Sequence, residues 1–467
     1  MTFSLKKLTK LQHAIIFITI TLLGLTAYGI GIPFLDLMEL KTIDLRFQSR
    51  EKTAPGSEVV LAVIDEKSIA QEGKWIWPRS KFVDLINKLS EAGAKVITFD
   101  IGFLEPDNKQ VVTAIENVQR GIDRFGHRSA NFDEFLEKLK ADSNYDLRLA
   151  EAIKNSKARV VLGYFFQMDQ ANVPELKEIE RRQHQKNIRH SKYNLERYSS
   201  AEARNIRLPE PAYPQSNIKD ISEAATYSGY FNMLPDKDGV VRWFPAVFKF
   251  GGTLYAPLAL VTVGAYQDEQ LAIYIDDYGV RDLQIGPSII PTNEDGCILI
   301  NYRGKEKTFP HISITDILRG KVSPDQLKNK IVIVGATAVG IYDLRVTPFS
   351  EVFPGPEIHA NLIDSVLAGD FLYQPKWSAI FDIIAILVVG FCLGIVLPRA
   401  SVIPGLAIGL GVFLSYILFC QFLFSNYGLV LNIIYPLSVL LLVYVSITAY
   451  RYFVETKQKR FIKDAFS

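Results

Sequence analysis

The sequence has few cysteines and almost no excess of charge of either sign. Only Cys297, Cys392 and Cys420 occur in 467 residues, and the last two lie inside apolar runs. The globular part between those runs therefore holds a single cysteine, cannot form an internal disulfide, and has to be stabilised by its own core. The formal net charge of +2 produces no large basic or acidic field, so nucleic acid is not expected as a partner.

Motifs of the common enzyme and metal-binding classes are also missing. The sequence has no GxSxG elbow, no P-loop and no GxGxxG after a strand, and Cys297 has no obvious histidine partner. Glu357 and His359 have no further ligand at a spacing such as HExxH. The turn at residues 236–239 begins like a calcium loop but lacks the remaining ligands, so we interpret it as a hairpin turn. We expect no catalytic residue and no metal site in this chain.

Long apolar runs, in contrast, are present at both ends of the chain. Residues 14–32, 377–397, 402–424 and 428–450 each match the roughly 20 apolar residues that a helix needs to cross a bilayer. The first run also suits a cleaved signal peptide, but it exceeds the usual apolar core of about 7–15 residues, and no convincing small-x-small site precedes Pro33. The sequence therefore predicts four transmembrane helices, with the lipid bilayer as a partner.

Basic residues set the expected orientation of these helices. They gather in residues 1–13, in the loop 398–401 and in residues 451–467, namely Lys6, Lys7, Lys10, Arg399, Arg451, Lys457, Lys459, Arg460 and Lys463. The positive-inside rule places these three segments in the cytoplasm. Residues 33–376 are then extracytoplasmic, either periplasmic or extracellular, in a multi-pass protein of the cell (inner) membrane.

Several residues in the apolar runs carry more specific expectations. Glycines recur with GxxxG spacing, which lets helix backbones approach closely, at Gly390, Gly394, Gly405 and Gly409. We favour packing within the three C-terminal helices over a dimer seam. Asp382 is interpreted as an interfacial residue, with a buried polar contact as the alternative. Pro436 is expected to kink the last helix.

The region between the apolar runs predicts a mixed α/β domain with a largely parallel sheet. Apolar strands alternate with amphipathic helices, as in sheets that are covered on both faces; the strands are residues 59–65, 96–103, 159–166 and 330–335, and the helices are 80–93, 145–156 and 355–369. Antiparallel hairpins are expected in residues 239–251, 273–286 and 288–302, where turn pairs separate alternating runs.

Two further segments are assigned by composition. Residues 169–220 are polar and heavily charged, which is typical of an exposed helical excursion with a loop. Residues 33–50 follow the first apolar run directly and mix apolar with charged side chains. We expect a helix there that rises from the membrane and packs onto the outer domain.

Ten short strings, in this order, resemble one known family. They are 43–47 (IDLRF), 60–68 (VLAVIDEKS), 75–80 (WIWPRS), 97–107 (ITFDIGFLEPD), 229–232 (GYFN), 235–242 (PDKDGVVR), 300–304 (INYRG), 330–338 (KIVIVGATA), 342–348 (YDLRVTP) and 354–360 (PGPEIHA). Together they resemble the CHASE-type-2 family, the second class of cyclase- and histidine-kinase-associated extracellular sensor domains. The resemblance covers nearly all of residues 33–376.

The C-terminal residues 457–467 (KQKRFIKDAFS) add a second resemblance, to the linker that enters the class III adenylate/guanylate cyclase domain. It implies a homodimeric receptor whose paired cytoplasmic domains make cyclic AMP. Mg²⁺ and ATP would then belong only to a cyclase domain that follows. No metal-binding aspartate pair stands in a cytoplasmic βαβ context here, so we expect no cofactor and no cyclase activity in this chain itself.

Candidate ligand-binding residues come from the ends of the predicted strands. Ligands of open parallel sheets bind beyond the carboxyl ends of the strands, and the candidates near those ends or in the matching strings are Asp65, Trp77, Arg79, Asp100, Glu105, Thr337, Asp343, Arg345, Glu357 and His359. The competing interpretation is structural: Asp65 and Asp100 cap helices, the two arginines pair with them, and Trp77 belongs to the core.

The sequence thus predicts a membrane receptor. Its outer domain detects an unidentified small-molecule or envelope cue, and its helices carry the change to a cytoplasmic output, cyclic AMP synthesis if the linker resemblance holds. A kinase output, an extracytoplasmic enzyme and a stand-alone membrane scaffold are the alternatives.

Overall fold

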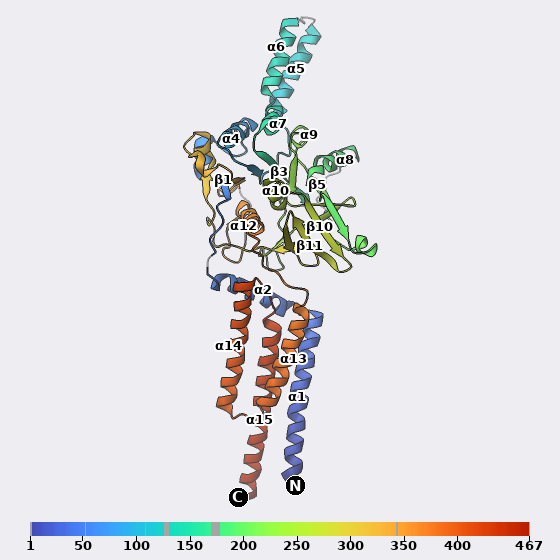
Figure 1. Ribbon diagram of the computed structural model, residues 1–467, viewed down its shortest axis with the longest axis vertical. Coiled ribbons are helices and arrows are strands. Elements are labelled where there is room, and N and C mark those ends of the chain that lie inside the picture. Colours follow the sequence, from blue (N-terminus) through green and yellow to red (C-terminus); the bar gives the residue numbers. More distant parts are fainter. Residues whose placement is uncertain are drawn as a thin grey trace. The chain divides into compact units, whose positions relative to one another are not determined.

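A computed structural model describes residues 2–51, 53–107, 109–125, 130–169, 178–341 and 344–466. The chain divides into two compact units. The helical unit combines residues 1–51 with residues 372–467, and the α/β unit comprises residues 52–371. Figure 1 labels the elements of both.

The helical unit contains the apolar helices that the composition predicts. Its elements are α1 (Thr2–Ile30), α2 (Pro33–Ser49), α13 (Ser378–Val396), α14 (Val402–Tyr427) and α15 (Ile434–Phe466). Among the described residues, four stretches are long and apolar enough to cross a membrane: Leu11–Ile30, Ser378–Val396, Val402–Tyr427 and Ile434–Lys457. The expectation of four membrane-length apolar helices is confirmed.

The last helix begins later than expected, and this corrects the interpretation of Pro436. Gly428 ends α14 in a left-handed conformation, with φ 67°, and α15 begins only at Ile434. Pro436 therefore lies in the first turn of α15, where its missing N–H would have no helical partner in any case. It does not kink the helix.

The helix expected in residues 33–50 is present as α2. It belongs to the helical unit, where it contacts α14 and α15. Its buried face includes Ile43 and Phe47, and the Phe47 ring meets the Phe424 ring edge-on at 5.3 Å. Two charged residues of α2, Glu39 and Arg46, are also buried and in contact with each other.

The two α13 glycines make close helix contacts, but with α1, which corrects the expectation that they pack within the three C-terminal helices. A Cβ on Gly390 would collide with Thr21, and a Cβ on Gly394 would collide with the ring of Phe17. The GxxxG of α13 thus packs on the first helix, outside the three C-terminal helices. Asp382 is fully buried, so the alternative interpretation as a buried polar contact applies.

The α/β unit is built on a mostly parallel sheet with the order β14-β1-β15-β2-β3-β5, and β6 pairs with β3. Only β5 runs antiparallel. The strands are β14 (His311–Ser313), β1 (Val59–Ile64), β15 (Ile331–Ala336), β2 (Val96–Phe99), β3 (Arg159–Gln167), β5 (Tyr213–Gln215) and β6 (Tyr227–Tyr230). The residues of β1, β2 and β15 are buried throughout, because helices cover both faces.

Each face of this sheet has its own helices. On one face, α4 (Arg79–Glu91), α7 (Tyr145–Asn155) and α9 (Lys219–Ala224) supply apolar side chains to one core cluster with the strands. On the other, α10 (Leu258–Gln267) and α12 (Gly355–Ala368) contact the strands. Shorter or peripheral helices are α3 (Glu66–Glu72), α5 (Lys109–Phe125), α6 (Ala130–Ser143), α8 (Glu178–Asn187), α11 (Ile314–Leu318), η2 (Arg189–Ser191), η3 (Glu202–Asn205) and η4 (Pro324–Gln326).

Of the three predicted antiparallel hairpins, the one in residues 273–286 forms, where β10 pairs with β11. The strands within 239–251 and within 288–302 pair with strands outside their own segments, because tertiary packing as well as turn residues decides which strands pair. A second sheet has the order β12-β11-β10-β4, and two-stranded ladders join β13 to β7, β8 to β9, and β16 to β17. The strands are β4 (Leu195–Tyr198), β7 (Trp243–Pro245), β8 (Phe248–Phe250), β9 (Thr253–Tyr255), β10 (Leu271–Asp276), β11 (Gly279–Ile285), β12 (Ser288–Pro291), β13 (Cys297–Leu299), β16 (Leu344–Arg345) and β17 (Phe353–Pro354).

The described residues of the polar stretch 169–220 contain more secondary structure than its composition indicates. Its described part contains the expected helix, α8, but also β4, which pairs with β10, and β5, which pairs with β3. Three of the four residues of β4 are exposed and the fourth is half-buried. The strand therefore carries no apolar alternation, and its pairing depends on a partner far away in the sequence.

Candidate functional site

Asp65 follows β1 and acts as a helix cap. Its carboxylate accepts a hydrogen bond from Ser68 N at 2.8 Å, at the start of α3, and another from the Ser313 hydroxyl at 2.8 Å. These contacts agree with the structural interpretation of Asp65. Thr337 follows the neighbouring strand β15, and its backbone N–H donates to Ile64 O at 3.0 Å.

Asp100 and His359 are the two predicted residues that the fold brings face to face. Asp100 follows β2, His359 lies on α12, and their Oδ1 and Nε2 atoms are 3.4 Å apart. The His359 side chain is 0% exposed, and neither ring nitrogen has a hydrogen-bond partner among the described residues. The Phe244 ring packs edge-on against the imidazole at 5.4 Å. Asp100 is therefore not a helix cap but half of a buried polar pair.

Arg79 lies in a separate cluster with Asp146. Its Nε is 3.4 Å from the Asp146 carboxylate, and its Nη2 donates to the backbone carbonyl of Glu105 at 2.8 Å. Burial raises the pKa of Asp146, and the Arg79 charge opposes that shift. Arg79 thus pairs with a residue that the sequence did not single out, and neither Asp65 nor Asp100 is its partner.

The remaining candidates have different surroundings. Trp77 is 2% exposed and donates from Nε1 to Gly73 O at 2.8 Å, so it belongs to the core. Arg345 lies in β16, which pairs with β17, and Asp343 lies outside the described residues.

Glu357 holds a loop. Its fully buried carboxylate accepts hydrogen bonds from the N–H groups of Lys307, Thr308 and Phe309 at 2.9, 2.8 and 3.3 Å. Burial raises the pKa of Glu357, although these N–H groups and the nearby His311 oppose the shift. The described candidates therefore form several small clusters and not one common site.

The turn at residues 236–239 surrounds an arginine that the sequence analysis missed. Arg242 is 0% exposed, and its guanidinium donates to the carboxylates of Asp236 at 2.8 Å and Asp238 at 2.8 and 2.9 Å. The two aspartates thus neutralise a buried cation, and Gly239 completes the turn with φ 84°. Residues 236–239 thus form a tight turn, as expected, but not a hairpin, because the strand that follows, β7, pairs with β13.

A polar cavity of about 430 Å³ opens elsewhere in the α/β unit. Its walls come from η2 and the residues after it, the start of β6, the C-terminal end of α10 and the start of β10. The lining residues are Arg189, His190, Lys192, Tyr193, Asn194, Thr226, Tyr227, Val261, Gly264, Ala265, Asp268, Glu269, Gln270 and Leu271. None of them was predicted, because they come from four separate segments that only the fold assembles.

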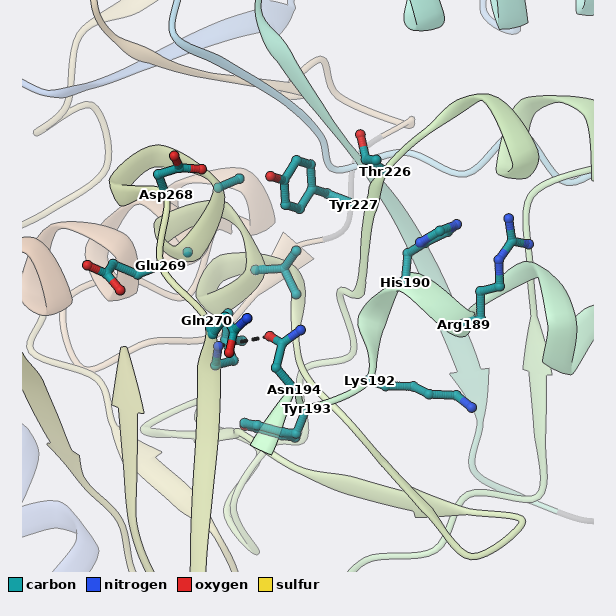
Figure 2. A pocket seen from close by; sticks show the side chains of 14 residues that line it. Arg189, His190, Lys192, Tyr193, Asn194, Thr226, Tyr227, Asp268, Glu269 and Gln270 are labelled. Carbon is teal, nitrogen blue, oxygen red and sulfur yellow. Dashed lines mark hydrogen bonds between the residues drawn. The ribbon is translucent and has the colours of Figure 1, made fainter. Parts of the chain in front are cut away.

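Figure 2 shows how charge is distributed around this cavity. Arg189, His190 and Lys192 lie on one side, and Asp268 and Glu269 lie on the other. Asn194 Oδ1 accepts from Leu271 N at 2.9 Å and joins two walls. Burial lowers the pKa of His190, and the neighbouring Arg189 charge lowers it further, so the imidazole is neutral near pH 7. The volume lies in the range of small-molecule sites, and its lining suits a polar ligand.

Within the described ranges, no group of three or more His, Cys, Asp or Glu side chains could hold a metal ion.

The chain is similar to one known family. A family model described as the CHASE2 domain matches residues 15–395. The comparisons with curated proteins and with solved structures find no match.

Proposed function

The chain belongs to the CHASE2 domain family, and from this premise we propose that it is a membrane receptor whose α/β unit lies outside the cytoplasm. CHASE2 domains are sensory. The observation that carries the proposal is the combination of this family with four membrane-length apolar helices. A sensory unit joined to such helices has the parts of a receptor that reports across a bilayer.

The distribution of basic residues supports the proposed orientation. The N-terminal lysines, Arg399 between α13 and α14, and Arg451 with the lysines after it all fall on one side when four helices cross the bilayer. Both ends of the chain are then cytoplasmic, and residues 33–376 are extracytoplasmic in the cell membrane.

The proposed output is cyclic AMP synthesis by a paired class III cyclase domain after residue 467. The supporting feature is the sequence of residues 457–467, at the cytoplasmic end of α15. In this proposal the receptor works as a homodimer, and Mg²⁺ and ATP belong to the cyclase domain.

The proposed cue is a small polar solute or envelope component, and the cavity in Figure 2 is its proposed site. Charges of both signs around about 430 Å³ support a polar rather than an apolar ligand.

Cysteine labelling in intact cells tests the orientation. Tyr278→Cys places a thiol at a position that is 77% exposed in the α/β unit, and Lys457→Cys places one on the exposed end of α15, each in a background without the three native cysteines. A membrane-impermeant maleimide should label position 278 in intact cells and position 457 only after permeabilisation. The reverse pattern would overturn the proposed orientation.

A reporter tests the output. A class III cyclase domain joined after Ser467 should raise cyclic AMP in cells, and removing α1 by truncation should change that level. Equal cyclic AMP with and without the truncation, at equal amounts of membrane protein, would contradict control of the output by this chain.

A further inference from the structure

Both chain connections between the α/β unit and the helical unit are hydrogen-bonded to one short segment, residues 428–434, which we call the hub segment. The first connection is α2, which leads into the α/β unit after Glu51. The Glu39 carboxylate on α2 accepts hydrogen bonds from Ile433 N at 2.9 and 3.0 Å and from Ile434 N at 2.7 Å. A displacement of α2 therefore acts directly on the hub segment.

The second connection leaves the α/β unit at Leu372. The next residue, Tyr373, donates its N–H to Gly428 O at 2.9 Å and accepts from Val430 N at 3.0 Å. Tyr373 and Leu429 thereby form a parallel β-bridge. The two connections lie more than 300 residues apart in the sequence, yet they bond to opposite ends of the same seven residues.

The apolar helices are fixed to the hub segment as well. Asn432 Nδ2 donates to the Asp382 carboxylate on α13 at 2.6 Å, and that carboxylate also accepts from the Tyr28 hydroxyl on α1 at 3.0 Å. The Tyr416 hydroxyl on α14 donates to Asn432 O at 2.9 Å. Polar contacts of this kind hold helices together in a bilayer, where apolar burial supplies no driving force.

The hub segment leads into α15, which runs from Ile434 to Phe466. Glu39 accepts from the backbone N–H groups at the start of this helix, and its negative charge also favours that position relative to the helix dipole. Arg46 Nη2 and the Thr42 hydroxyl hold the carboxylate in place at 2.9 and 3.0 Å. Glu39 is 9% exposed, so water does not readily substitute for it.

We propose that residues 428–434 are the point at which movement of the α/β unit is passed to α15, with Glu39 as the positioning residue of the contact. Displacement of either connection shifts the start of α15, and the rigid helix carries the shift along its length. The inference rests on the proposed function only in taking α15 as the output helix.

The first test lengthens one chain connection and measures amide hydrogen–deuterium exchange in the hub segment, using the full chain in nanodiscs. A Gly-Ser-Gly-Ser insertion between Glu51 and Lys52 should speed amide exchange in residues 429–434 by about fivefold or more, because the loosened α2 docks less firmly. The same insertion between Asp277 and Tyr278, in the turn between β10 and β11, is the matched control and should leave these amides unchanged. Unchanged exchange after the first insertion would overturn the proposal.

The second test removes the charge of Glu39. Glu39→Gln keeps the side-chain shape, and the Ile433 and Ile434 amides should exchange about tenfold or more faster, as expected for the loss of hydrogen bonds to a charged acceptor. Asp44→Asn, on the same helix but paired with Lys41 at 3.7 Å, is the control. In the cyclase reporter, Glu39→Gln should change cyclic AMP and Asp44→Asn should not; equal effects of the two variants would count against the hub segment.

The two proposals fail separately in these experiments. A reversed labelling pattern or a silent reporter would refute the proposed function and leave the exchange measurements informative. Unchanged amide exchange together with a working reporter would refute only the proposed role of the hub segment.

Discussion

The α/β unit and the helical unit both bury charged side chains, but their apolar residues serve different purposes. In the α/β unit, strands such as β1 and β15 are buried along their whole length, and removing them from water drives folding. In the helical unit, large apolar side chains such as Leu418 and Ile403 are 66% and 81% exposed. In the proposed membrane receptor lipid surrounds them, so small residues and polar contacts decide how the helices pack.

Two glutamates make the comparison concrete. Glu357 and Glu39 each present a buried carboxylate to backbone N–H groups of a distant segment. In the α/β unit the segment is a loop, and the basic residue nearby is His311, whose Nε2 atom lies 3.8 Å from the Glu357 carboxylate. In the helical unit the segment starts a membrane-length helix, and the cation is Arg46 at 2.9 Å. The same contact thus closes a loop in one unit and joins helices in the other.

The largest effect should come from the apolar core of the α/β unit. Phe82 on α4 is 1% exposed and packs against the rings of Phe99 and Phe103. Phe82→Ala should destabilise this unit by about 3–5 kcal/mol. Leu418→Ala on α14, at an exposed position, should change stability by less than about 0.5 kcal/mol. Thermal unfolding of the solubilised chain compares the two, and similar losses would remove the distinction between the units.

Close packing in the helical unit should give the next largest effect. A Cβ on Gly394 collides with the Phe17 ring, whereas no described atom lies within 4 Å of a Cβ on Gly411. Gly394→Ala should cost about 1–3 kcal/mol through overpacking, and Gly411→Ala should be neutral. Unfolding in mild detergent measures the stability of both variants. Equal stabilities would mean that the close contact at Gly394 does not stabilise the packing of α1 on α13.

Titration of Glu357 should give a pH dependence confined to the α/β unit. Because burial raises its folded-state pKa, the folded protein holds this proton more tightly than the unfolded chain. The stabilisation of the folded state by this bound proton is fully present below the unfolded pKa of about 4.3. It is lost as the pH rises through the raised folded-state pKa. Glu357→Gln cannot titrate, so its melting temperature should depend less on pH between these two pKa values. An identical pH profile in the two proteins would exclude this role.

The smallest effect should come from Asp382. Asp382→Asn keeps the side-chain shape but removes the carboxylate that accepts from Tyr28 and Asn432. Hydrogen bonds between membrane helices contribute about 0.6 kcal/mol on average, with a maximum near 1.7, so unfolding in detergent should shift slightly. A loss as large as that of Phe82→Ala would show that polar contacts, not apolar burial, carry most of the stability.

The elements that sequence analysis located well are those with a strong local pattern. Residues 80–93 were expected as a helix and form α4 (Arg79–Glu91), and residues 59–65 were expected as a strand and form β1. Pro436 was misjudged because its role depends on where α15 begins. The pairing of β4 with β10 was missed because edge strands with exposed side chains show no apolar period.

The contacts of the candidate site residues were harder to predict from the sequence than the fold was. Asp65 was correctly weighed as a cap because a cap needs only its own following residues. Arg79 was given the wrong partners, because Asp146 comes from a helix 67 positions later in the numbering. The cavity in Figure 2 was not foreseen, because its lining residues have no shared motif.

By itself the sequence determined the apolar helices, the class of the α/β unit and the CHASE2 family, because hydrophobic period, chain length and motif order are local properties. Only the tertiary structure decided which buried polar groups meet. Glu39 reaches Ile434, Asp100 reaches His359 and Arg242 lies between two aspartates. The energy of a buried charge depends on the partner that replaces its water, and that partner is chosen by the fold.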